Sequence, residues 1–430
     1  MFNLGSVLSH ARPASLALLA SAAVVAAAGF QPARAAETVL YSFKGPDGAN
    51  PLAGLIADTQ GALYGTTPNG GSHDQGAVFK LTPPAAGQTQ WTETPLYSFT
   101  GGADGGYPVA GLIFDTDGAL YGTTQSYESY GRSTINAGTV FKLTPPAAGK
   151  TQWTLSVLYT FPTHSSDGAS PSGRLIFDTH GALYGTTQRG GSSSSGTVFK
   201  LTPPTSGTGP WTETRLFEFA PPFGKPNAGL IFDSHGALYG TGMGTGFGEV
   251  FKLTRPTSGN GPWTETTLFQ YPLNYNDKGA LNGDLTFDSR GALYGTFTAG
   301  PIFKLTPPAS GNGPWTETVL YKVPRDIGSI ALIFDTQGSL YGTTAGGGSS
   351  NNGTVFKLTP PESGTGPWTD TVLHTFSRSD GANPRATLIF GPGGVLYGTT
   401  LYGGKSDKGT VFQISILPSC PPGVPKPIPY

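Results

Sequence analysis

Six aspartates recur at one place in a repeated pattern and could hold a cation or a sugar. Each follows a run of aromatic and β-branched residues within a glycine-rich loop: Asp47, Asp104, Asp167, Asp277, Asp326 and Asp380. If these loops meet at one mouth, the carboxylates form an acidic ring suited to Ca²⁺ or a polyol, because hard cations take several oxygen ligands. A close pair among them could instead catalyse glycoside hydrolysis. The plainer interpretation, which we favour, is a recurring turn that uses Asp-Gly chemistry.

Aromatic residues in the same set of loops could stack against sugar rings. Tyr107, Tyr127 and Tyr130 are candidates, with Tyr275 and Tyr402 at related places. Each could equally cover a loop as a surface aromatic, and we favour that interpretation. The glutamates of the repeated string WTET, by contrast, are expected on the strand surface: Glu93, Glu213, Glu265 and Glu317.

Other constellations that support catalysis are absent from the sequence. Histidines beyond the N-terminal segment are few, namely His73, His164, His180, His235 and His374. There is no GxSxG, HExxH or P-loop motif, so we lean away from an enzyme and expect no cofactor apart from Ca²⁺ at the acidic ring. The net charge is −1 with scattered basic residues, which argues against nucleic-acid binding.

A seven-fold internal repeat supplies the elements that must position these residues. The string LYGT occurs with its tyrosine 47 to 63 residues apart, at Tyr64, Tyr121, Tyr184, Tyr239, Tyr294, Tyr341 and Tyr397. In the second copy, strands are expected at 111–115, 119–124, 138–144 and 153–161, because β-branched and aromatic residues fill these runs and Gly, Pro and Asp separate them.

These strands are apolar on both faces, so each sheet must lie between two others. We therefore predict an all-β fold, a seven-bladed β-propeller of four-stranded antiparallel blades. An open solenoid is the alternative, but it would need capping units that the sequence lacks.

The two ends of the repeat region complement each other. Residues 37–43 read as a fourth strand without its preceding loop, and residues 409–414 as a third strand with no fourth after it. We predict that the N-terminal strand pairs with the last blade and closes the ring, so that the propeller spans residues 37–416. A Pro-rich tail follows at 417–430 and holds the single cysteine, Cys420.

Residues 1–35 are predicted to be a signal peptide, with a basic start, an apolar centre at 14–30 and small residues before the cleavage point. Cleavage is expected after Ala35, with Ala36 as an alternative. The rival interpretation is an uncleaved membrane anchor, for which the run is short and rich in alanine. The mature chain has no other apolar stretch of spanning length.

Two sets of loops differ in how strongly they repeat. Turns between first and second strands are nearly identical, and their aspartates suit hairpin corners: Asp58, Asp115, Asp178, Asp233, Asp288 and Asp335, with Gly391 in the seventh copy. Loops between second and third strands, and those between blades, are diverse. Because variable loops on a rigid scaffold commonly carry binding, we place the candidate site on that face, at the channel mouth.

The consensus LIFDTxGALYGTT…GTVFKLTPP…GxWTETVLYSF resembles the GloVer (Gloeobacter/Verrucomicrobia-type) tandem repeats of exported bacterial proteins, over residues 37–416. The resemblance implies a secreted or surface-held repeat protein and supplies no catalytic residues. Members often end in a C-terminal anchor, whereas the tail here has neither an apolar helix nor a basic stop, so release is expected.

We accordingly expect a secreted, extracellular or periplasmic monomer that binds a glycan, peptide or protein. A carbohydrate-active hydrolase or lyase with a carboxylate pair at the channel mouth is the alternative.

Overall fold

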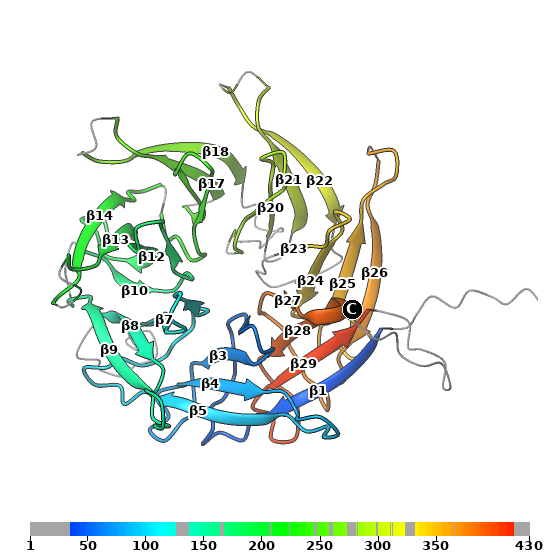
Figure 1. Cartoon of the computed structure of the whole chain (residues 1–430). Coiled ribbons are helices and arrows are strands. Elements are labelled where there is room, and N and C mark those ends of the chain that lie inside the picture. Colours follow the sequence, from blue (N-terminus) through cyan, green and yellow to red (C-terminus); the bar gives the residue numbers. More distant parts are fainter. Residues whose placement is uncertain are drawn as a thin grey trace, which may run out of the picture.

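The chain forms a ring of seven antiparallel β-sheets around a central channel (Figure 1). This is a computed structural model, and it describes residues 35–125, 137–163, 167–205, 207, 209–222, 224–244, 247–257, 261–272, 281, 283–297, 300–309, 311, 313–322, 332–364 and 366–416. The predicted seven-bladed propeller is confirmed, and the open solenoid is excluded. Residues 1–34 of the predicted signal peptide, the Pro-rich tail and its Cys420 lie outside the described residues.

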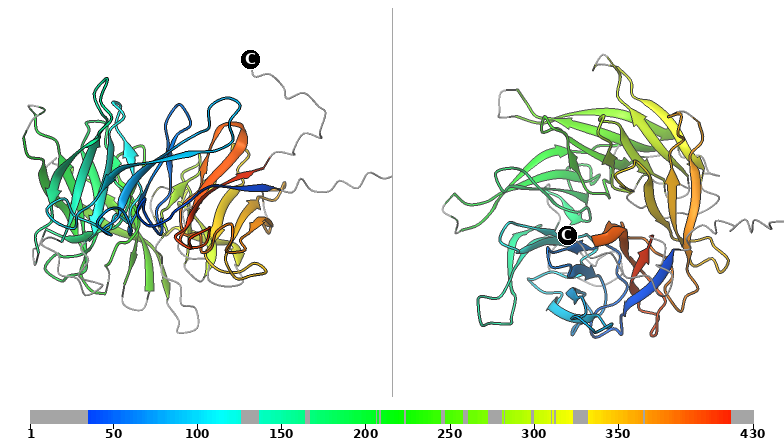
Figure 2. Two further views of the ribbon diagram at one scale, coloured as in Figure 1. Left: turned by 90° about the horizontal axis from the view of Figure 1, so that it is seen from below. Right: turned by 45° about the vertical axis from the view of Figure 1, so that its right-hand side comes forward.

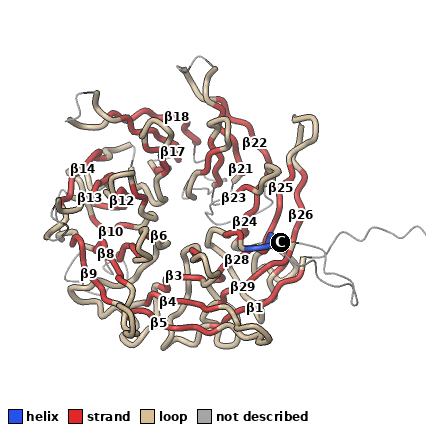
Figure 3. Tube along the Cα trace, in the orientation of Figure 1, coloured by secondary structure: helices blue, strands red, loops and turns tan. Residues whose placement is uncertain are grey.

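Each blade runs from a short inner strand at the channel to a long outer strand at the rim (Figures 1 and 3). Blades 1 to 3 comprise β2 (Ile56–Ala57), β3 (Leu63–Thr67), β4 (Ala77–Thr82) and β5 (Thr92–Ser98); β6 (Ile113–Phe114), β7 (Leu120–Gln125), β8 (Gly138–Thr144) and β9 (Thr154–Thr160); and β11 (Ile176–Phe177), β12 (Leu183–Arg189), β13 (Thr197–Thr202) and β14 (Thr212–Glu218).

Blades 4 to 6 repeat the pattern with β15 (Ile231–Phe232), β16 (Leu238–Met243), β17 (Phe247–Thr254) and β18 (Thr264–Pro272); β19 (Thr286–Phe287), β20 (Leu293–Thr296), β21 (Pro301–Thr306) and β22 (Thr316–Lys322); and β23 (Ile333–Phe334), β24 (Leu340–Thr344), β25 (Thr354–Thr359) and β26 (Thr369–Thr375). An extra strand, β10 (Ala169–Pro171), pairs with β12 in the loop that enters blade 3. The sequence pattern predicts a loop for this segment, and the structure shows a short strand within it.

Blade 7 is assembled from both ends of the chain. It contains β27 (Ile389–Phe390), β28 (Val395–Thr400), β29 (Thr410–Ser415) and, as its outer strand, β1 (Ala36–Ser42). β1 pairs antiparallel with β29 from Ala36 opposite Ser415 to Ser42 opposite Thr410. The predicted closure of the ring is confirmed, and it leaves β29 without a free edge.

Hydrophobic cores lie between the blades. Seven clusters of buried residues each combine side chains from two neighbouring sheets, and one of them joins blade 7 to blade 1 through Phe43, Phe79 and Tyr397. Tyrosine of the LYGT string packs edge-on against the next blade. Tyr64, for example, lies 5.2 Å from Phe114 and 6.4 Å from Trp153 between ring centroids. The predicted two dry faces of each sheet are thereby explained.

Hydrogen bonds also link neighbouring blades. In several blades the threonine of the LYGT string donates to a carbonyl at the inner edge of the following blade, as Thr66 Oγ1 does to the Ala110 oxygen at 3.0 Å and Thr186 Oγ1 to the Ala228 oxygen at 3.0 Å. Thr399 of blade 7 donates to the Ala53 oxygen of blade 1 at 3.3 Å. The last bond spans the closure in the same way as the others.

The aspartates of the repeated turns fix the hairpin corners, as predicted. Asp115 Oδ1 accepts hydrogen bonds from the amides of Asp117 and Ala119 at 3.0 and 2.8 Å, and Oδ2 accepts from the Tyr121 hydroxyl at 3.0 Å. Lys142 pairs with the same carboxylate at 3.1 Å and lies 5.1 Å above the Tyr121 ring. In blade 7 a single-turn 3-10 helix, Pro392–Gly394, takes the place of this turn.

No helix among the described segments has the length and apolar character needed to cross a membrane.

The residue directly after the closing strand β1, Phe43, carries a side chain whose removal tests this architecture. Phe43 is fully buried between blades 7 and 1, so Phe43→Ala should lower the free energy of unfolding by about 3–5 kcal/mol. Urea unfolding measures the change. Thr38→Ala, at an exposed position of β1, should have little effect. Equal losses for the two variants would contradict the closure.

Candidate functional site

A cavity of about 390 Å³ opens in the central channel, and the inner edges of the blades line it. Its lining comes mainly from the segments that enter the inner strands of blades 1 to 5 and 7, together with Gln125 and Gln188 at the ends of β7 and β12. The cavity therefore faces the side of the ring that carries the diverse loops. Figure 2 shows the ring edge-on, with loops projecting from both faces.

Three charged side chains break the repeat at the cavity. The residue just before the leucine of each inner strand is glycine in blades 1, 2 and 4, but it is Arg174 in blade 3 and Asp284 in blade 5. Arg385 enters from blade 7. Both arginines are exposed, and the cavity holds two positive charges and one negative charge among its described lining residues.

The charged groups differ in how they are held. Asp284 Oδ1 accepts a hydrogen bond from the Gly229 amide at 2.6 Å, and Arg385 Nε donates to the Asn383 side-chain oxygen at 2.5 Å. Within the part of the chain that the structure describes, the Arg174 guanidinium has neither a hydrogen bond nor an ion pair. Its donors are thus free to meet a ligand.

Amides and hydroxyls complete the lining. The Gln188 side chain donates to the Asn227 side-chain oxygen, and Ser172 Oγ donates to the Asn227 carbonyl at 3.2 Å. Tyr107, one of the predicted site residues, also lines the cavity; it is 9% exposed and its backbone has a positive φ of 58°. The Tyr107 amide donates to the Gln75 carbonyl at 2.8 Å, which anchors this residue between blades.

The predicted acidic residues lie elsewhere. Asp47, Asp104, Asp167 and Asp380 are not among the residues lining the cavity. Each carboxylate contacts the outer strand that precedes its loop, accepting from the hydroxyls of Tyr41, Tyr97 and Tyr159 or contacting the His374 ring.

Three of these carboxylates also accept a backbone amide within their own turn, those of Lys44, Thr100 and Ser377, each at 2.8 Å. The plainer interpretation, turn chemistry, accounts for these contacts. Four other predicted site residues, Tyr127, Tyr130, Asp277 and Asp326, lie outside the described residues, as does Tyr275.

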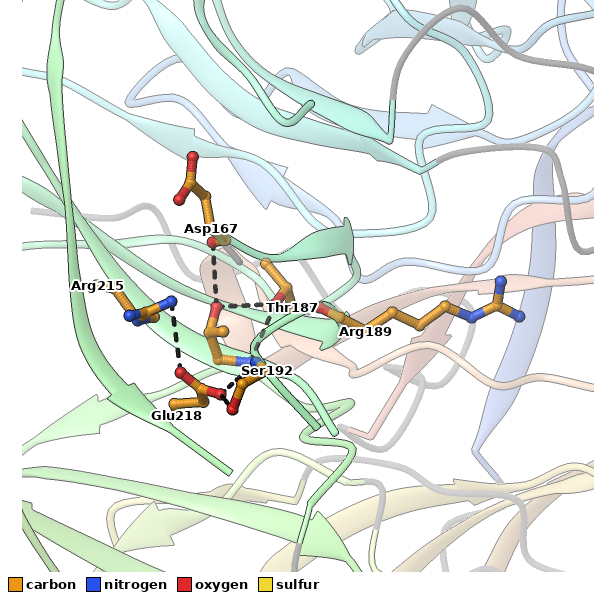
Figure 4. Close-up of polar contacts among 7 residues, drawn as sticks. Asp167, Thr187, Arg189, Ser192, Arg215 and Glu218 are labelled. Atoms are coloured by element: carbon orange, nitrogen blue, oxygen red, sulfur yellow. Dashed lines mark hydrogen bonds and ion pairs between the residues drawn. The ribbon is translucent and has the colours of Figure 1, made fainter. Parts of the chain in front are cut away.

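The diverse loops are tied to the outer strands by polar contacts, as blade 3 shows (Figure 4). Ser192, in the loop between β12 and β13, donates from both its amide and its hydroxyl to Glu218 on β14. Arg215 pairs with the same carboxylate at 3.4 Å. In the two strands that this loop connects, the hydroxyls of Thr187 and Thr197 lie 2.9 Å apart. The loop is therefore held in one position relative to its blade.

The expectation for the WTET glutamates was wrong. All four are half-buried, and Glu93 and Glu213 lie close to the loop aspartates Asp47 and Asp167. Burial, and then the charge of Asp47, raises the pKa of Glu93 to about 8. Burial and Asp167 likewise raise the pKa of Glu213 to about 7. The strand surface at that point is covered by the neighbouring blade, which a single repeat does not reveal.

Blade 4 departs from this pattern. The loop that enters it has no aspartate, and its β17 carries Glu249 where blades 2 and 3 carry Thr139 and Thr197. Glu249 is 1% exposed, and burial together with the charge of Glu265 raises its pKa to about 7. This junction therefore still holds two carboxyl groups, those of Glu249 and Glu265, although Glu249 comes from β17 and not from the loop.

These raised pKa values predict how stability depends on pH. The folded chain binds a proton on Glu93 more tightly than the unfolded chain, so the free energy of unfolding should fall as the pH rises from about 4.5 to about 8. Glu93→Gln should flatten this dependence in urea unfolding at pH 5 and pH 8. Glu362→Gln, at an exposed position, serves as the control; a Glu93→Gln profile identical to the wild-type profile would refute the assignment.

Sequence reasoning missed the arginines and the aspartate of the cavity because it compared loops and treated the inner strands as constant. The available signal was the position before the inner-strand leucine, where Gly54, Gly111 and Gly229 contrast with Arg174 and Asp284. A substitution at a position that is otherwise the same in most repeats marks a residue that the scaffold itself does not require.

Solved structures share the fold. Virginiamycin B lyase from Staphylococcus aureus aligns with a TM-score of 0.51 and 14% identity, over 89% of this chain and 99% of that one. The extracellular domain of a protein assigned as a hybrid two-component system of B. thetaiotaomicron aligns with a TM-score of 0.54 and 12% identity, over 87% of this chain and 39% of that one. At these identities the likeness shows the fold alone.

The sequence itself carries a family assignment. No curated protein matches it. The model of the Gloeobacter/Verrucomicrobia repeat matches residues 28–208, 129–305 and 296–419, which together span the whole ring. The chain therefore belongs to the Gloeobacter/Verrucomicrobia repeat family.

Proposed function

We propose that this chain is an exported, non-enzymatic binding propeller whose central cavity holds an anionic, hydroxyl-rich ligand, with a sugar acid as the best-fitting class. The observation that carries the proposal is the free guanidinium of Arg174 in a cavity that Arg385 also lines. A guanidinium recognises a carboxylate by two parallel hydrogen bonds, so an acidic group is the expected partner.

The rest of the lining supports a sugar rather than an apolar acid. Gln125, Gln188, Asn227 and Ser172 offer amide and hydroxyl groups that can donate to and accept from sugar hydroxyls. Tyr107 adds an aromatic ring at the same cavity. A volume of about 390 Å³ is in the range of small-molecule sites and suits one or two sugar rings.

A binding role is better supported than hydrolysis or elimination. Glycoside hydrolysis needs two carboxyl groups across the scissile bond, and Asp284 is the one carboxyl-bearing residue in the described lining of the cavity. Among the loop aspartates that the structure describes, Asp47, Asp104 and Asp380 are engaged within their own turns at the blade junctions. Support for export comes from the predicted signal peptide and from an extracellular domain among the propellers of similar fold.

The cavity arginines supply the test. Isothermal titration with a galacturonate or glucuronate disaccharide should show binding to the wild-type chain, and the Arg174→Ala/Arg385→Ala double variant should bind at least about 10-fold more weakly because the carboxylate loses its partners. Lys150→Ala, at an exposed position, should bind as the wild type does. Circular dichroism checks that the double variant is folded.

Two outcomes would overturn the proposal. Equal binding of the carboxyl-reduced, neutral disaccharide would show that no acidic group is recognised. Release of shorter or unsaturated sugars during incubation with the wild-type chain would show catalysis instead of binding alone.

A further inference from the structure

A second candidate site lies at the junction where the ring closes, away from the cavity. Three side chains from separate segments converge there: Glu37 on β1, His374 on β26 and Asp380 in the loop that follows β26. One ligand atom from each lies within 4.8 Å of the others. We propose that these residues form a binding site for Zn²⁺ that clamps blade 6 to the closing strand.

The donor set fits zinc better than calcium. One imidazole nitrogen and two carboxylates are ligands that Zn²⁺ takes, with water in a fourth tetrahedral position, whereas Ca²⁺ needs six to eight oxygens. His374 Nε2 and Asp380 Oδ2 are 3.1 Å apart. Two ligand atoms on a tetrahedral zinc ion stand about 3.3 Å apart, so this pair already has the required spacing.

The third ligand is available. Glu37 Oε1 is buried and has no hydrogen-bond partner among the described residues, a state that costs free energy unless a cation or donor satisfies it. Asp380 is held from behind, because its Oδ1 accepts from the Ser377 amide at 2.8 Å and from the Ser377 hydroxyl at 3.2 Å. Such outer contacts orient a metal-binding carboxylate.

His374 distinguishes the junction between blades 6 and 7 from the other junctions of the ring. Between blades 7 and 1 the corresponding residues are Tyr41, Asp47 and Glu93, and the tyrosine hydroxyl donates to the aspartate. His374 occupies the place of that tyrosine in the same strand position. It replaces a neutral hydroxyl donor with an imidazole, the side chain that most often binds zinc.

Bound zinc would act on the closure directly. Glu37 belongs to the strand that completes blade 7, while His374 and Asp380 belong to the end of blade 6. An ion shared among them ties two segments more than 330 residues apart, from 37 to 374. Because such a site exists only in the folded ring, zinc should stabilise the folded state. This inference does not depend on the proposed ligand of the cavity.

Titration of zinc chloride into the EDTA-treated chain, prepared without a histidine tag, tests the inference. We expect one zinc ion per chain by calorimetry and a melting temperature that rises with zinc concentration. His374→Tyr should bind zinc at least about 100-fold more weakly. This variant should still fold with the same melting temperature in EDTA, because tyrosine already occupies the corresponding position at Tyr41, Tyr97, Tyr159 and Tyr321.

Matched variants sharpen the result. Glu37→Gln should also weaken binding, whereas His235→Ala, which removes an exposed histidine of blade 4, should not. Tyr41→His should create a second zinc site with Asp47 and Glu93. Three results would each overturn the inference. The first is absence of zinc binding by the wild-type chain, and the second is an unchanged zinc affinity in His374→Tyr. The third is Ca²⁺ binding that persists in His374→Tyr and displaces zinc.

Discussion

Mutual coverage of neighbouring sheets is the constraint on which this structure depends. Each sheet is apolar on both faces, so a blade is stable only when it lies between two others, and a linear stack would always leave two faces bare. Pairing of β1 with β29 closes the ring, so the free face of blade 7 and the free face of blade 1 cover each other. The inter-blade cores then repeat around the whole ring, and tyrosine–tryptophan contacts and threonine hydrogen bonds join most neighbouring blades, including blades 7 and 1.

Residues that repeat in every blade and residues that break the repeat have separate roles. In blades 1 to 6 the turn aspartate, the LYGT tyrosine and the lysine of the third strand lie together at the hairpin, as Asp115, Tyr121 and Lys142 do in blade 2. In blade 7, Gly391 stands in place of the aspartate and Gln413 in place of the lysine, so both charges are absent there. Arg174, Asp284 and His374, by contrast, stand where the scaffold uses other residues, and they line the cavity or the closing junction.

Much of the fold could be predicted from the sequence, because LYGT and its neighbours recur often enough to fix the blade number, the strand order and the closure. The geometry between blades could not. The sequence of one repeat does not reveal that Glu93 meets the loop of the preceding blade, which is why it was expected on the surface and is half-buried instead. For the loop aspartates, the favoured interpretation as turn residues agrees with the four that the structure describes, which contact their own outer strands, whereas the alternative acidic ring at the channel mouth is not formed by these four.

Amide hydrogen exchange on the folded chain tests the closure most directly. If β1 is the outer strand of blade 7, the amide of Phe43 at its end, which donates to the Gly409 carbonyl at 3.0 Å, should exchange as slowly as the amide of Phe99 at the end of β5, which donates to the Gly76 carbonyl at 3.0 Å. Exchange of β1 at the rate of an unstructured terminus, with β5 still protected, would contradict a ring closed by its first strand.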